Sequence, residues 1–131
     1  MKTPVKLSSK ASQYYVIAER WGSDLDFFKV EDNFYHHLLD KYVNSSSSTA
    51  HLEKLKKLGG ELKILEEERL KVEILVGELL NRIALMADDK VPENLKEVET
   101  SHTTIELLMI DLIKKYRRFK RDLFNTVVNI K

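Results

Sequence analysis

The chain of 131 residues contains no cysteine, only four glycines and only two prolines. Without cysteine it has no disulfide framework, no thiolate nucleophile and no cysteine-ligated zinc or iron–sulfur site. Sandwiches and barrels need a turn roughly every 8 to 12 residues, and this supply of glycine and proline is too small for them. With 43% hydrophobic and 33% charged residues, the chain can bury a core beneath a densely charged surface. Composition therefore predicts a single domain of long helices.

Long hydrophobic runs are also absent. The apolar stretches at 14–18 and 83–87 are each five residues long. A secretory signal needs an apolar region of about 7 to 15 residues, and a membrane-spanning helix needs about 20. We therefore expect a soluble, cytoplasmic protein with no membrane span, and the absence of cysteine agrees with that compartment.

Two turn-forming stretches divide the chain into three segments. One is the serine run at 44–49, and the other is 88–94, which contains Pro92. Pro92 suits the first turn of the third helix, because the N–H that proline lacks would have no partner there. Ser48 or Thr49 can cap the second helix, which follows the serine run. We expect a flexible N-terminus at 1–8 and a single helical domain at 9–131, with helices at about 9–43, 50–88 and 93–129.

In each segment, apolar residues recur at alternating steps of three and four, which keeps one stripe of a helix facing its partners. Asp32, Arg69 and His102 are the only strongly polar members of these stripes. The first stripe continues in phase through Gly22, although Gly22-Ser23 also resembles a helix start, so a break at 22–23 stays open. The three stripes are Ala11, Tyr14, Ala18, Trp21, Leu25, Phe28, Asp32, Tyr35, Leu39 and Tyr42; Leu55, Leu58, Leu62, Leu65, Arg69, Val72, Val76, Leu79, Ile83 and Met86; and Leu95, Val98, His102, Ile105, Met109, Leu112, Tyr116, Phe119 and Leu123.

Helices of equal length with short connections predict an all-α, antiparallel up-down-up three-helix bundle with coiled-coil-like heptad packing. Folding about the turns pairs residues whose numbers add to about 94 in the first two helices and about 181 in the last two. This register places Tyr35 opposite Gly59, which makes room for the ring. It also places Asp111 opposite Arg69, and Arg118 near Asp32. Buried charges are costly unless they are paired, so these pairs are candidates for fixing the register.

The second and third segments carry more apolar residues than one stripe needs. A helix that is apolar on most faces is buried on most faces. We therefore expect self-association, most simply a homodimer, through the apolar faces of 70–86 and 105–113. The alternative is that the N-terminal segment 6–21 covers this surface. The residues outside the stripes are Leu70, Ile74, Leu75, Leu80, Ala84, Leu85, Leu107, Leu108, Ile110 and Ile113.

The most distinctive local feature is a basic run at 114–121, where Tyr116 and Phe119 lie between six cations. Residues 114–131 carry a net charge of +6 and residues 1–113 a net charge of −5. Such a helix can neutralise phosphates of nucleic acid or of an anionic lipid surface. The other interpretation is internal pairing with acidic residues of the first two helices, Glu31, Asp32, Glu61, Glu66 and Glu67. The candidate anion-binding or nucleic-acid-binding residues are Lys114, Lys115, Arg117, Arg118, Lys120 and Arg121.

A metal site or an enzyme would need residue patterns that the sequence supplies only in part. Glu99 and His102 have the Glu-x-x-His spacing of bundle metal sites, but a second such pair is missing. Asp32, His36 and Asp40 form a helical stripe that could hold an ion, although basic residues are expected beside it. A phosphate-binding loop and a nucleophile elbow are also absent from the sequence. We therefore expect no catalytic residue, no metal and no cofactor.

The spacing of aromatic residues and leucines from 21 to 39, followed by two long heptad helices, resembles a group of small bacterial helical proteins with no assigned activity. The resemblance covers about two thirds of the chain and implies the helical fold alone. The expected function is that of a non-enzymatic interaction or scaffold protein that self-associates. Nucleic-acid or anionic-surface binding through 114–121 is the alternative, and a bundle metalloprotein is the third interpretation. The matching positions are Trp21, Leu25, Phe27, Phe28, Glu31, Phe34, Leu38 and Leu39.

Overall fold

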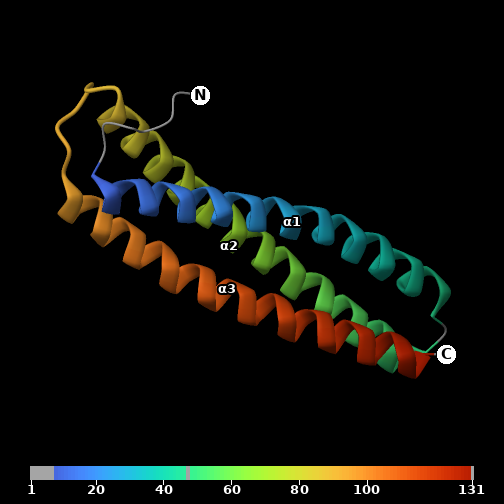
Figure 1. Ribbon diagram of the computed structural model, residues 1–131. Coiled ribbons are helices and arrows are strands. Elements are labelled where there is room, and N and C mark those ends of the chain that lie inside the picture. The colour runs from blue at the N-terminus through green and yellow to red at the C-terminus, as the bar shows by residue number, and fades with distance from the viewer. Residues whose placement is uncertain (1–7, 47, 131) are drawn as a thin grey trace. The chain divides into compact units, whose positions relative to one another are not determined.

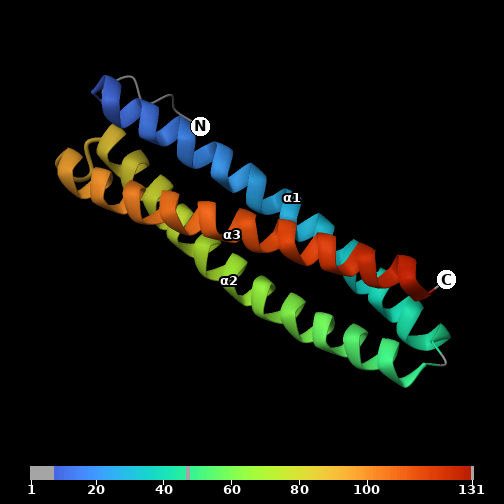
Figure 2. The ribbon, with the colours of Figure 1, turned by 90° about the horizontal axis from the view of Figure 1, so that it is seen from below.

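The protein is an all-α three-helix bundle, as the sequence predicts. The computed structural model describes residues 8–46 and 48–130, and over these residues it contains no β-strand. The helices are α1 (Ser9–Ser45), α2 (Thr49–Ala87) and α3 (Leu95–Ile130), shown in Figures 1 and 2. Most of the expected flexible N-terminus, residues 1–7, lies outside the described residues.

The contacts between helices divide the chain into two units, and each helix contributes a stretch to both. The first unit contains the described residues of 8–25 and 70–110. The second unit contains those of 26–69 and 111–130. Within each unit α1 and α3 run in the same direction and α2 runs in the opposite direction, as the views in Figures 1 and 2 agree.

Side-chain and backbone caps set the helix ends. Ser48 caps α2, because its Oγ accepts a hydrogen bond from the backbone N–H of His51 at 3.4 Å. At the other end of α2, Asp89 has a φ of 58°. The backbone N–H groups of Asp89 and Lys90 donate to Met86 and Leu85, which is a Schellman-type C-cap.

Most of the expected helix bounds differ from the observed ones by one or two residues, and α1 ends at Ser45 instead of at residue 43. The first helix is continuous through Gly22 and Ser23, so the alternative break does not occur. The third helix begins at Leu95, two residues later than expected. Asn94 is its cap, because the Oδ1 of Asn94 accepts a hydrogen bond from the backbone N–H of Glu97 at 3.1 Å. Pro92 therefore precedes the helix instead of occupying its first turn.

The predicted stripes form the core. Every member of the second stripe is at most 5% exposed, including the charged Arg69. In the third stripe only Leu95, at the start of α3, is partly exposed. In the first stripe Tyr14, Trp21, Phe28 and Tyr42 are partly exposed, and the other six members are buried.

The register between α2 and α3 is close to the predicted one, but the register between α1 and α2 is not. Lys115 pairs with Glu68, within two residues of the expected position. Asp32, however, pairs with Arg69, seven residues beyond the position that the turn predicts. The expectation that Gly59 makes room for Tyr35 is also wrong, because no atom lies within 4 Å of a Cβ built on Gly59.

Candidate functional site

The two aromatic residues of the basic run belong to the core of the second unit. Tyr116 and Phe119 are each 3% exposed. Tyr116 stacks on Phe28 with ring centroids 4.4 Å apart, and Phe119 meets Tyr35 edge-on at 5.3 Å. These two rings are therefore structural and cannot serve as stacking surfaces for a ligand.

Two of the six cations in the run are paired within the chain. The Nζ of Lys115 lies 3.1 Å from Glu68 and 3.0 Å from Asp111. Its hydrogen bonds to Asp111 and Glu68 raise the pKa of Lys115. The Nζ of Lys120 lies 3.9 Å from Oε2 of Glu31. Internal pairing was expected, and Glu31 is one of the expected acidic residues.

The other four cations form what we call the cationic row: Lys114, Arg117, Arg118 and Arg121. All four are exposed, and none has a carboxylate within 4 Å among the residues that the structure describes. Their spacing of i, i+3, i+4 and i+7 places them on one side of α3. Internal pairing therefore leaves an uncompensated positive surface on the second unit.

An exposed apolar surface on α1 was not predicted from the sequence; we call it the aromatic stripe, and it consists of Phe27, Val30 and Phe34. These side chains are 62%, 65% and 52% exposed. A third exposed ring, that of Phe124 on α3, lies 6.0 Å from the Nζ of Lys120. The missed signal was the i, i+3, i+7 spacing of three apolar residues outside the buried stripe.

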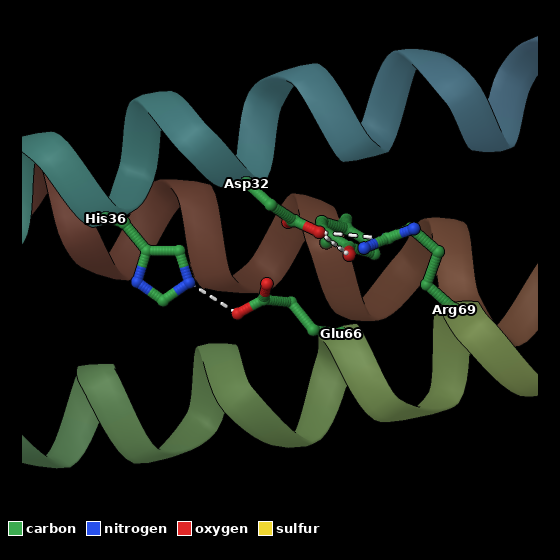
Figure 3. A network of polar contacts seen from close by, with 5 residues as sticks. Asp32, His36, Glu66 and Arg69 are labelled. Carbon is green, nitrogen blue, oxygen red and sulfur yellow. Dashed lines mark hydrogen bonds and ion pairs between the residues drawn. The ribbon is translucent and has the colours of Figure 1, made fainter.

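Inside the second unit, a buried polar network joins all three helices. The Oδ2 of Asp32 accepts a hydrogen bond of 2.9 Å from Nε of Arg69 and another of 2.9 Å from the hydroxyl of Tyr116. Figure 3 shows the side chains of Asp32 from α1 and Arg69 from α2 pointing toward one another. Asp32 is 1% exposed, and its Oδ1 has no hydrogen-bond partner among the residues that the structure describes.

Burial governs the ionisation of this network. It raises the pKa of Asp32, and the hydrogen bonds from Tyr116 and Arg69 oppose that rise. Burial also raises the pKa of Tyr116, and the negative charge of Asp32 raises it further. The hydroxyl therefore stays protonated and donates to the carboxylate.

This network corrects the pairing expected for the two buried charges. Arg69 was expected to face Asp111, and Asp32 to lie near Arg118. Instead Asp32 and Arg69 pair with each other. Asp111 is 58% exposed at its side chain and lies 3.0 Å from Lys115, one helical turn away. The shift of seven residues between α1 and α2 brings Asp32 to Arg69. Asp111 does not reach Arg69, because its side chain is on a solvent-exposed side of α3.

A second polar contact lies beside the network. The Nε2 of His36 on α1 lies 2.5 Å from Oε1 of Glu66 on α2, as Figure 3 shows. The side chain of His36 is 48% exposed, so this contact is partly solvated. Over the described ranges, no group of three histidine or carboxylate side chains is arranged to hold a metal ion. The stripe of Asp32, His36 and Asp40 thus forms no such group.

In the first unit, His102 is enclosed by aromatic rings. Its ring centroid lies 4.5 Å from that of Tyr14 and 4.6 Å from that of Trp21. The residue is 7% exposed, and within the described part of the chain its Nε2 has no hydrogen-bond partner. Burial lowers the pKa of His102, while the charge of Glu106 acts in the opposite direction. His102 is thus a neutral core residue, and the Glu99 of the same motif lies instead 4.0 Å from Lys10.

The first unit also leaves aliphatic side chains in water. On α2, Leu70 and Ile74 are 51% and 61% exposed. On α3, Leu107, Leu108 and Ile110 are 63%, 38% and 46% exposed. We call these five residues the aliphatic face. They stay exposed in the presence of α1, so the described part of segment 6–21 does not cover them.

Comparison with protein-family models, with curated protein sequences and with solved structures finds no match to this chain. Among the residues that the structure describes, no helix is both long and apolar enough to cross a membrane.

Proposed function

We propose that the protein is a non-enzymatic interaction module that forms a cytoplasmic homodimer through its aliphatic face. The observation that carries this proposal is the exposure of Leu70, Ile74, Leu107, Leu108 and Ile110 on one unit. Contiguous apolar patches on the surface of a soluble protein mark sites of protein contact.

The residues of the aliphatic face lie at the same level of α2 and α3. A groove of about 170 Å³ is lined by Leu75 and Leu79 from α2 together with Thr104 and Ile105 from α3. None of the five residues lines this groove. Leu70 and Ile74 share one side of α2, and Leu107 and Ile110 share one side of α3, because the members of each pair are three or four residues apart. All five belong to the first unit.

A second copy of the chain suits this surface better than a charged partner. The five members of the aliphatic face carry no charge, so two copies can meet about a two-fold axis without opposing like charges. In such a dimer, α2 and α3 of one copy pack against α2 and α3 of the other copy. The interface is then a four-helix arrangement, which is a common way to bury apolar helix faces.

The buried charges support a structural role over a catalytic one. Asp32 is 1% exposed, so a substrate has no direct access to its carboxylate. The more accessible His36 is in contact with Glu66. A general base must come within hydrogen-bond reach of the proton that it removes, and the enclosed Asp32 does not meet that condition.

The test is the solution mass, measured by sedimentation and light scattering over a range of protein concentrations. The wild-type chain is expected to sediment as a dimer. Ile74→Glu and Leu107→Glu are each expected to give monomers, because each places two symmetry-related charges in the contact. The matched control is Ile64→Glu, since Ile64 is 57% exposed on the same helix α2 but belongs to the second unit.

Circular dichroism separates loss of assembly from loss of folding. A folded monomer for both variants on the aliphatic face, with a dimer retained by the Ile64→Glu control, supports the proposal. A monomeric wild-type chain, or equal dissociation of all three variants, contradicts it.

A further inference from the structure

The cationic row is not explained by folding. Lys114, Arg117, Arg118 and Arg121 are exposed, and none of them forms an ion pair with a described carboxylate within 4 Å. Clustered cations on one side of a helix attract phosphates and concentrate them near the surface. The chemistry of the ligand is therefore that of a polyanion.

The two sides of α3 differ in charge. Toward α2, Arg118 lines a groove of about 260 Å³ together with three acidic residues, Glu61, Glu68 and Asp122. Toward α1, Lys120 lies beside Glu31, and this is the only ion pair between α1 and α3 among the described residues of the second unit. Arg117 lies three residues before Lys120, hence on the same side of α3. A chain of phosphates is therefore repelled by the α2 side and attracted by the α1 side.

The aromatic stripe lies on that favourable side. Glu31 is four residues after Phe27 and three before Phe34, so these three residues share one side of α1. Because Glu31 reaches Lys120, that side of α1 borders the cations of α3. The rings of Phe27 and Phe34 are more than half exposed and are held about 10 Å apart along the helix. The exposed ring of Phe124 adds a third platform beside Lys120.

We propose that the second unit binds single-stranded nucleic acid along the border between α1 and α3. Lys114, Arg117 and Arg121 of the cationic row hold the phosphates, and Phe27, Phe34 and Phe124 stack on bases. Cationic tracks with aromatic platforms are the usual means by which proteins bind single strands without sequence preference. A duplex or a flat anionic membrane is wider than a single strand and meets the acidic α2 side as well, so the geometry favours the single strand.

The test is fluorescence anisotropy of the full chain with labelled oligothymidine and oligouridine of about 20 nucleotides, titrated at several salt concentrations. The triple variant Lys114→Gln, Arg117→Gln and Arg121→Gln is expected to bind at least about tenfold more weakly at low salt. Its slope of log affinity against log salt is expected to fall by about 2, because three phosphate contacts are lost. The matched control is Lys54→Gln, Lys56→Gln and Lys57→Gln, which removes three exposed cations from α2 in the same unit and is expected to lose less than about threefold.

The stacking part of the proposal has its own variants. Phe27→Ala combined with Phe34→Ala removes two exposed rings and no charge. It is expected to weaken single-strand binding by about tenfold or more while leaving the salt slope unchanged. The control is Val30→Ala, which shortens the neighbouring exposed side chain between them. Thermal melting shows that each variant is folded.

Several results overturn the proposal. One is the absence of binding to either oligonucleotide at low salt. Another is an equal loss of affinity in the triple variant of the cationic row and in the triple-lysine control on α2. A third is binding to a duplex as tight as binding to a single strand. Retention on vesicles of phosphatidylcholine and phosphatidylserine without oligonucleotide binding also overturns it and assigns the surface to a membrane. The dimer test on the aliphatic face is independent of these outcomes, because it concerns the other unit.

Discussion

The Nε of Arg69 lies 2.9 Å from Oδ2 of Asp32, and the two side chains are only 6% and 2% exposed. Both residues occupy positions in otherwise apolar stripes, so each is a charge that burial penalises unless the other is present. A slip of α1 against α2 by seven residues places Asp32 opposite Leu62. Such a slip separates the two charges inside the core. The pair therefore selects one register among several that the apolar pattern allows.

Replacing one member of this pair is expected to be strongly destabilising. Arg69→Leu leaves the carboxylate of Asp32 buried with Tyr116 as its remaining hydrogen-bond donor. Loss of one partner from a buried ion pair costs about 3 to 5 kcal/mol. We expect the free energy of unfolding, measured by urea denaturation, to fall by about that amount.

The double variant Asp32→Leu and Arg69→Leu separates pairing from simple loss of contacts. It is expected to recover most of the stability lost in Arg69→Leu, because no uncompensated charge remains in the core. The control is the exposed pair of Lys115 and Glu68, where Lys115→Leu is expected to cost less than about 1 kcal/mol. Additive losses in the double variant contradict the pairing argument.

His102 makes stability depend on pH. Its pKa in the folded state is lower than the ordinary value of 6.5, so the unfolded chain takes up a proton first as the pH falls. The unfolding free energy therefore decreases below a pH of about 6.5, by up to about 1.4 kcal/mol per pH unit, until the pH passes the folded pKa. His102→Phe removes this titrating group. We therefore expect the free energy of unfolding of His102→Phe, minus that of wild type, to increase as the pH is lowered from 8 to 5, as measured by denaturation at each pH.

The control for this titration is His37→Gln, because His37 is exposed on α1. Its stability relative to wild type is expected to change little over the same pH range. A constant difference between His102→Phe and wild type across that range shows that His102 is not the residue responsible.

The core was predictable from sequence because the alternation of three and four fixes which side of a helix is buried. Arg69, Asp32 and His102 were correctly placed in the interior on spacing alone. The register of α1 against α2 was not predictable in the same way. A heptad stripe has the same apolar pattern after a shift of seven residues, so the pattern alone allows several registers. The turn sequence at 44–49 does not resolve this ambiguity, because it does not determine at which residue each helix ends or begins.

The candidate surfaces were only partly predictable for a related reason. Lys115 and Lys120 differ from Lys114 and Arg121 only in their angle about α3. That angle decides which cations reach Glu68 and Glu31. A correct register was needed to identify these partners, so the number of unpaired cations emerged only from the structure.

A glycine in the middle of α2 offers a direct gain in stability. A Cβ built on Gly60 meets no atom within 4 Å, and glycine costs about 1 kcal/mol relative to alanine inside a helix. Gly60→Ala is therefore expected to raise the free energy of unfolding by about 0.5 to 1 kcal/mol. Chemical denaturation measures this change, and a loss of stability shows that the residue is needed for a contact outside the single chain.

The start of α3 depends on one side chain. The Oδ1 of Asn94 accepts a hydrogen bond from the backbone N–H of Glu97, and its Nδ2 donates to the side chain of Glu97 at 3.3 Å. Asn94→Ala removes both bonds and is expected to lower the free energy of unfolding by about 1 kcal/mol. Asn33→Ala is the control, because Asn33 is exposed in the middle of α1, where alanine is the better helix former. It is expected to be neutral or slightly stabilising in the same denaturation experiment, and equal losses in both variants contradict a capping role for Asn94.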